Sequence, residues 1–156
     1  MPTDSTTETS VQRSVTVPLD PVKAFELFTA RMDEFWPREH HIGAAEMAEA
    51  VLEPKVGGRW FEKGVDGSEC NWGRVVAWEP PSRLVLLWQI TAEWQYDPSL
   101  ETELEITFTP EGAGTRVELE HRNLDRFGDQ FLAMRTMFEG PGAWAGTLAA
   151  YAAVAG

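Results

Sequence analysis

The sequence has 156 residues, of which 43% are hydrophobic and 24% are charged, and these values suit one globular domain with a full core. Its formal net charge of −12 repels phosphate backbones and anionic lipid surfaces, so we expect neither nucleic-acid binding nor membrane association. Cys70 is the only cysteine, which excludes an intrachain disulfide and a cysteine-based zinc site and fits a reducing, cytoplasmic compartment.

The chain begins with a polar segment. Residues 1–10 are mostly Ser, Thr and acidic residues, and this composition predicts a disordered N-terminal tail. The segment has no basic region and no apolar run, so it does not read as a secretory signal. We expect residues 11–156 to form a single domain.

A strand and a helix are predicted next. Residues 11–18 alternate between apolar and polar side chains, which is typical of an edge strand that ends at a proline. Asp20 and Pro21 then suit the N-cap and first position of a helix. Aromatic and methionine side chains continue at helical spacing as far as Pro37. Residues 38–48 fit either a short second helix or a loop.

A series of strands follows, separated by turn signals such as Gly57-Gly58, Asp66-Gly67 and Pro80-Pro81. The expected strands span residues 47–56, 59–63, 70–78, 83–94, 102–109 and 115–122. The last two alternate cleanly, so one face of the sheet is packed and the other is wet. This pattern and the short connections indicate an antiparallel sheet.

The chain ends in two helical segments, a short one over residues 125–138 and an alanine-rich one over residues 141–156. In the second, Trp144, Leu148 and Tyr151 fall on one face. This helix is too apolar to lie in water. We therefore predict an α+β fold in which a curved antiparallel sheet of about six or seven strands surrounds the C-terminal helix, with a cavity between them.

Several short motifs, in a fixed order, carry a family resemblance. They are PKVGGRW at 54–60, GRV at 73–75, PPSRL at 80–84, Trp88, GTRV at 114–117, His121 and GAW at 142–144. With them the chain resembles the START-like (SRPBCC, helix-grip) superfamily, and within it the family named for the C-terminal domain of the heat-shock-protein-90 ATPase activator. The resemblance covers roughly residues 12–155 and implies the helix-grip fold, with one or two short helices after the first strand.

The resemblance implies a fold more than a function, because this fold hosts ligand carriers, cyclases, lipid-transfer domains and chaperone partners. The namesake co-chaperone resembles a two-domain protein, and this chain has no room for the second domain. We therefore do not expect a co-chaperone role from the family name.

Seven Trp and eight Phe residues point to a hydrophobic small molecule as the partner. The alanine-rich helix presents little bulk, so it leaves volume between itself and the sheet, and apolar pockets are the usual small-molecule sites. We predict non-enzymatic binding there; a tryptophan-rich core without a pocket remains the alternative. The expected ligand-binding residues are Trp36, His41, Trp60, Trp72, Trp88, Phe108, His121, Phe138 and Trp144.

An enzyme of the cyclase or hydrolase kind is the second hypothesis, with His121 or Glu62 as general acid or base. His121 falls on the inward register of its strand, where it could equally be satisfied by a backbone carbonyl. Glu62 shares a strand face with Trp60, and Arg74 shares one with Trp72. Inward faces would give a buried Glu–Arg pair, whereas outward faces would give surface ion pairs. We favour outward for Arg74, and no catalytic constellation stands out.

Metal and cofactor sites are not expected. Glu39, His40 and His41 are adjacent and lack the spacing of a zinc helix, so they fit a surface loop or one overhanging the cavity mouth. Gly57-Gly58 lacks the Lys-Ser/Thr of a phosphate loop. A protein-interaction module that uses the acidic face is the third hypothesis, and a homodimer through an exposed strand or aromatic face stays open.

Overall fold

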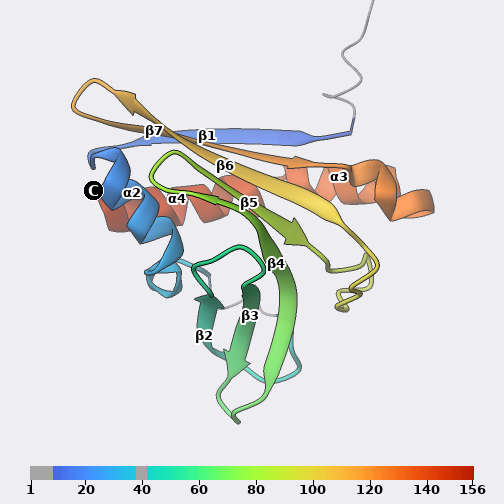
Figure 1. Ribbon diagram of the computed structural model, residues 1–156. Helices are drawn as coiled ribbons and strands as arrows, with labels where there is room; N and C mark the ends of the chain where they lie inside the picture. The colour runs from blue at the N-terminus through green and yellow to red at the C-terminus, as the bar shows by residue number, and fades with distance from the viewer. Residues whose placement is uncertain (1–8, 38–41) are drawn as a thin grey trace, which may run out of the picture.

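A computed structural model describes residues 9–37 and 42–156. Seven strands form one antiparallel sheet in the order β1-β7-β6-β5-β4-β3-β2 (Figure 1). The strands are β1 (Val11–Val17), β2 (Met47–Leu52), β3 (Arg59–Gly64), β4 (Glu69–Glu79), β5 (Arg83–Trp88), β6 (Thr102–Glu111) and β7 (Gly114–Arg122). The helices are α2 (Pro21–Thr29), η1 (Met32–Glu34), η2 (Leu124–Gln130), α3 (Phe131–Glu139) and α4 (Trp144–Ala155).

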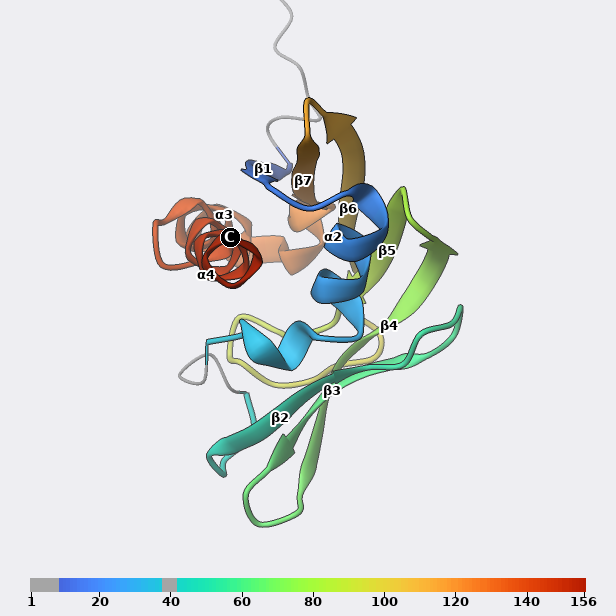
Figure 2. The same ribbon diagram turned by 90° about the vertical axis from the view of Figure 1, so that its left-hand side faces the viewer.

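The sheet curves around the C-terminal helix. Figure 2 looks almost along α4, with the sheet running from β1 at the top, past β5, to β2 at the bottom. The helix lies on the concave side, together with α2. The α+β helix-grip fold predicted from the sequence is therefore confirmed, with seven strands where six or seven were expected and short helices after the first strand.

Element boundaries differ from the predictions where turns interrupt the pattern. The strand expected over 83–94 ends at Trp88, and the one expected over 47–56 ends at Leu52. The last helix begins at Trp144, because residues 141–143 form a turn. The helix expected over 125–138 is divided into η2 and α3, and η2 itself is kinked at Gly128, whose φ of 64° is not helical. Residues 42–46 are not helical.

The start of the domain is attached to the fold at residue 9. The carbonyl of Thr9 accepts a hydrogen bond from the Leu124 amide at 3.0 Å, and Ser10 is buried. Residues 1–8 of the predicted tail lie outside the described residues. The domain bounds of 11–156 stay a prediction.

The predicted cap of α2 is present: the carboxylate of Asp20 accepts a hydrogen bond from the Lys23 amide at 2.9 Å, and Pro21 occupies the first turn. The cap directs Phe25 and Phe28 onto the sheet, where both rings contact Phe108. Helix α2 therefore supplies two aromatic rings to the core, and both pack against β6.

Two irregularities in β4 decide which side chains point inward. The register with β3 skips Trp72, and the register with β5 skips Val76, as in β-bulges. Because each bulge shifts the alternation by one residue, Trp72 is buried while Arg74 is exposed and pairs with Glu101 at 2.9 Å. The outward orientation favoured for Arg74 is correct, and Arg74 and Trp72 do not share a face.

The outer face of the sheet carries ion pairs. Arg122 on β7 contacts Glu103 at 2.8 Å and Glu105 at 2.7 Å, and Arg83 also pairs with Glu105. Burial alone would raise the pKa of Glu105, but hydrogen bonds from Arg122 and Arg83 outweigh it and lower that pKa. Among the described residues, no helix has both the length and the apolar character needed to cross a membrane.

Candidate functional site

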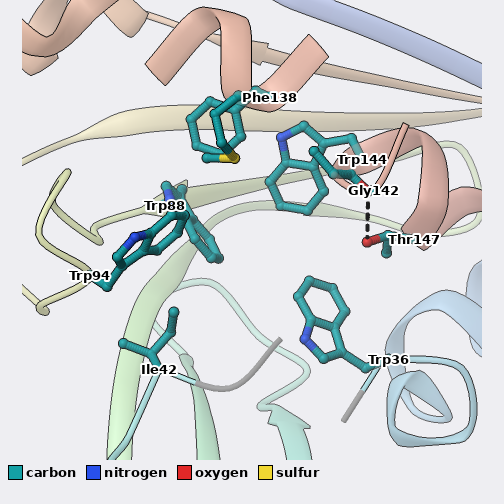
Figure 3. Close-up of a pocket in the computed structure, with 10 residues that line it drawn as sticks. Trp36, Ile42, Trp88, Trp94, Phe138, Gly142, Trp144 and Thr147 are labelled. Atoms are coloured by element: carbon teal, nitrogen blue, oxygen red, sulfur yellow. Dashed lines mark hydrogen bonds between the residues drawn. The ribbon is translucent and has the colours of Figure 1, made fainter. Parts of the chain in front are cut away.

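A cavity of about 360 Å³ lies between the start of α4, the end of α3, the end of β5 and the side chains of Trp36 and Ile42 (Figure 3). Its described walls are almost wholly apolar, and four of them are indole rings. The lining residues are Trp36, Ile42, Trp88, Trp94, Met137, Phe138, Gly142, Ala143, Trp144 and Thr147. The one hydroxyl among them, on Thr147, donates to the Ala143 carbonyl at 3.3 Å.

Two further tryptophans form a second layer behind the cavity wall. The ring of Trp60 lies 5.8 Å from that of Trp36 and 5.5 Å from that of Trp88, and the ring of Trp72 lies 5.0 Å from Trp36. Both second-layer rings are fully buried. The indole nitrogen of Trp60 donates to the sulfur of Met32 at 3.2 Å. This layer supports the positions of the rings that face the cavity.

A buried carboxylate fixes the edge of the cavity. Oε1 of Glu62 accepts hydrogen bonds from the amides of Ile42 at 2.5 Å and Gly43 at 3.0 Å, and from the indole of Trp72 at 2.9 Å. These donors compensate the burial of the charge, as hydrogen bonds to a carboxylate can. Since Arg74 points outward, the buried Glu–Arg pair considered above does not form. Glu62 instead holds the backbone at Ile42, a lining residue.

The buried side chain of His121 holds Trp144, which forms another wall of the cavity. The indole of Trp144 donates to Nδ1 of His121 at 3.1 Å, so the ring proton of the neutral histidine sits on Nε2. Nε2 then donates to the Thr102 hydroxyl at 2.8 Å, and that hydroxyl donates to the Trp88 carbonyl at 2.7 Å. Complete burial lowers the pKa of His121 from the usual 6.5 to about 3. His121 faces inward, as expected, and it is neutral and oriented toward Trp144.

Trp94 forms the exposed rim of the cavity. It lies in the loop between β5 and β6, the residue is 45% exposed, and its φ is 62°. Hydrogen bonds from Trp94 N to Thr91 O at 2.9 Å and from Thr91 N to Gln95 O at 2.8 Å close the turn that holds it. A bulky residue rarely adopts positive φ, and such conformations concentrate at ligand-binding sites.

The eight predicted ligand-site residues that the structure describes fall into three groups. Trp36, Trp88, Phe138 and Trp144 line the cavity. Trp60, Trp72 and His121 lie one layer behind it. Phe108 does not line the cavity, because α2 covers it: its ring lies 5.1 Å from Phe25 and 6.0 Å from Phe28. His41 lies outside the described residues.

Six lining residues are not predicted by the sequence pattern, namely Ile42, Trp94, Met137, Gly142, Ala143 and Thr147. Thr147 carries a detectable signal, since it is three positions after Trp144 on the same helix and therefore shares its face. The alternating pattern predicts a strand through Trp94, but β5 ends six residues earlier, at Trp88. The others lie in turns and at helix ends, where no periodicity reports their direction.

Other candidate chemistry is sparse. Within residues 9–37 and 42–156, no cluster of three or more His, Cys, Asp or Glu side chains could hold a metal ion. Cys70 is half-buried, and burial followed by the charge of Glu62 raises the pKa of its thiol, which disfavours the nucleophilic thiolate.

Comparisons with known proteins agree with this architecture. The family model described as Activator of Hsp90 ATPase homolog 1-like protein matches residues 19–153. A search of curated proteins gave no match.

Among solved structures, the chain is 40% identical to an anthrahydroquino-gamma-pyrone synthase, Txn09, complexed with SUM; the match covers 94% of this chain and 96% of the other, with a TM-score of 0.65. It is 30% identical to CalC, a self-sacrificing resistance protein from Micromonospora echinospora, over 92% of this chain and 91% of the other, with a TM-score of 0.68. An Aha1 dimer from Colwellia psychrerythraea shares the fold at 15% identity, with a TM-score of 0.60 and coverage of 94% and 95%.

Proposed function

The chain belongs to the family of Activator of Hsp90 ATPase homolog 1-like proteins, and we propose that it binds a planar hydrophobic small molecule in the cavity beside α4. The observation that carries the proposal is the apolar cavity of about 360 Å³ with four indole rings in its walls. Flat aromatic walls stack on flat ligands, and apolar cavities with few polar groups are the usual small-molecule sites.

The ligand that fits this cavity is uncharged. No described lining residue has an ionisable side chain, and a buried charge without a partner is costly. A fused-ring compound such as 9-fluorenone therefore serves as a suitable probe, since it is planar, neutral and small.

The proposal is tested by titrating the purified protein with 9-fluorenone. Calorimetry measures the affinity, and native mass spectrometry measures the number of molecules bound per chain. We expect one molecule bound per chain. Thr147→Phe fills the cavity from α4 and should abolish binding, whereas Ala149→Phe places the same ring on the exposed side of the same helix and should leave binding unchanged. If both variants bind 9-fluorenone equally well, the ligand does not bind in this cavity.

A second candidate function is ring closure on an aromatic substrate, and it is favoured by the 40% identity to a synthase over nearly the whole chain. In closure of a γ-pyrone ring, a phenol oxygen bonds to a ketone carbon and the phenol proton passes to the ketone oxygen, which gives a cyclic hemiketal. That hydroxyl then leaves as water with one hydrogen of the neighbouring CH₂ group, and the ring double bond forms between the two carbons. His121 and Glu62 lie behind the cavity wall in this structure, so we assign the cavity the role of holding the substrate in its folded shape.

The test of this candidate uses 1-(2-hydroxyphenyl)butane-1,3-dione, which closes to 2-methylchromone with loss of water. Chromatography measures the rate with wild-type protein, with Thr147→Phe and with Ala149→Phe. Acceleration by the wild type and Ala149→Phe, and not by Thr147→Phe, would support catalysis in the cavity. Equal rates with and without protein would leave binding as the function.

Other expectations remain proposals. The absence of enzymatic activity, a cytoplasmic location, a homodimer and a protein-interaction role each need direct measurement, and native mass spectrometry of the same sample reports the subunit number.

A further inference from the structure

Four threonine side chains are buried in the described part of the chain, and their hydroxyl groups differ in how well they are paired. The hydroxyls of Thr29, Thr102 and Thr115 each donate to a backbone carbonyl at 2.7 Å. The hydroxyl of Thr147 donates to the Ala143 carbonyl at 3.3 Å, which is beyond the usual range of about 2.5–3.0 Å. The one loosely paired hydroxyl of the four therefore belongs to the cavity wall.

The backbone of α4 explains why this bond is loose. The Ala143 carbonyl already accepts the amide of Thr147 at 3.1 Å, in the first turn of the helix. A threonine hydroxyl that reaches back to the carbonyl four positions earlier shares an acceptor that the helix already uses. The hydroxyl oxygen also has two lone pairs, and no described residue donates to them.

The free side of this hydroxyl faces the cavity. Thr147 is 2% exposed and lines the cavity, so the surface that it keeps is turned to that space. In Figure 3 its oxygen points from α4 into the space between the rings of Trp36, Trp88 and Trp144. The indole nitrogen of Trp144 is used by His121, and those of Trp36 and Trp88 are shielded from the cavity. Thr147 is therefore the polar side chain that a ligand meets inside the rim.

From this arrangement we infer that Thr147 is the specificity-determining residue of the cavity and selects a planar ligand with a hydroxyl group over a hydrocarbon of the same shape. The inference rests on the proposed function, since it concerns the same cavity. A ligand hydroxyl can donate to the free lone pairs of Thr147 while the bond to Ala143 stays in place. A ligand carbonyl can only accept, so it requires the Thr147 proton to turn away from that bond.

The apolar walls make this single contact decisive. A ligand hydroxyl that enters an apolar cavity loses its hydrogen bonds to water, and it binds well only where the wall supplies a new one. Thr147 supplies that bond, and the hydroxyl brings no charge into a described lining without an ionisable side chain. One typical hydrogen bond changes a dissociation constant about threefold to tenfold.

The experiment compares three probes that have the same fused rings and differ at carbon 9: fluorene has a CH₂ group there, 9-fluorenone a carbonyl and 9-fluorenol a hydroxyl. Dissociation constants are measured with wild-type protein, Thr147→Val, Thr147→Ser and Thr136→Val. Valine keeps the shape of threonine and removes the hydroxyl, whereas serine keeps the hydroxyl. Thr136→Val is the matched control, because Thr136 is an exposed residue of α3.

We expect the preference for 9-fluorenol over fluorene to fall about threefold to tenfold in Thr147→Val, which corresponds to the loss of one hydrogen bond. Thr147→Ser should keep the preference within about twofold of wild type, and Thr136→Val should not change it. The preference is a ratio of two affinities for the same protein, so a loss of stability in α4 alone would not alter it.

Three outcomes would overturn the inference. The same preference in wild type and Thr147→Val would show that the hydroxyl is unused, while the proposed binding function stands. A fall confined to the preference for 9-fluorenone would show that Thr147 donates to a carbonyl, and selection of a hydroxyl would be wrong. If none of the three probes binds the wild-type protein, the proposed function fails and the inference fails with it.

Discussion

The two ends of α4 cover two aromatic clusters that differ in how they are filled. The closed cluster, at the C-terminal end, consists of Phe25, Phe28, Phe35, Phe108 and Tyr151. Its rings pack at centroid distances of 5.1 to 6.0 Å, and the Tyr151 hydroxyl donates to the Ala24 carbonyl at 2.8 Å. The open cluster, at the N-terminal end, contains Trp36, Trp60, Trp72, Trp88 and Trp144 and surrounds the cavity.

The difference separates stability from binding. The closed cluster places its one polar atom against a backbone carbonyl, so nothing in it awaits a ligand. The open cluster contains larger rings with more polar atoms, and it leaves space beside them. Its walls keep their positions because Glu62 and His121 hold them from behind. We therefore expect substitutions in the closed cluster to change stability alone.

Phe28→Ala should give the largest effect, because Phe28 is fully buried and contacts Phe35, Phe108 and Tyr151. Loss of such a ring lowers the free energy of unfolding by about 3–5 kcal/mol. Urea denaturation measures the loss. Affinity for 9-fluorenone in the folded variant should stay within about twofold of wild type, and a tenfold loss would mean that the two clusters are coupled.

Glu62→Gln should weaken the open cluster from behind. The neutral amide is a weaker acceptor for the amides of Ile42 and Gly43 and for the Trp72 indole, so we expect a loss of about 1.5–3 kcal/mol in unfolding free energy. Hydrogen exchange at the Ile42 amide should quicken. Glu69→Gln, at an exposed ion pair with Arg59, should cost less than about 1 kcal/mol. Equal losses would contradict an anchoring role for Glu62.

Acid should destabilise the protein through His121. Its folded pKa of about 3 lies below the usual 6.5, so the unfolded chain takes up the proton first. The contribution of neutral His121 to the free energy of unfolding is fully present above about pH 6.5 and decreases as the pH is lowered toward 3. We expect the free energy of unfolding to fall by about 2 kcal/mol between pH 7 and pH 5. Urea denaturation of wild type and His121→Gln at both pH values isolates this contribution. The same pH dependence in both would assign it to other groups.

Trp94→Gly should have the smallest effect on stability and a clear one on binding. Glycine adopts the φ of 62° without strain, so the unfolding free energy should change by less than about 1 kcal/mol. Loss of the indole at the rim should weaken 9-fluorenone binding about threefold to tenfold. Unchanged affinity would show that the ligand does not reach the rim.

Local patterns in the sequence were sufficient to predict most of the fold. Alternation over 102–109 and 115–122 predicted β6 and β7, and Asp20-Pro21 predicted the start of α2. These features depend on neighbours a few residues away, so they are visible in the chain itself. Four of the nine predicted ligand residues line the cavity, because large aromatic side chains on inward faces gather where the core is widest.

Periodicity and composition are sufficient to predict an antiparallel sheet, an apolar C-terminal helix and an excess of aromatic side chains between them. Which of those aromatic side chains enclose a cavity and which fill a core depends on how distant segments pack. The bulge at Trp72 turns that ring inward and Arg74 outward, and α2 covers Phe108 while the start of α4 leaves space beside Trp88. The volume left between packed side chains depends on contacts between segments far apart in the chain, and no local periodicity encodes those contacts.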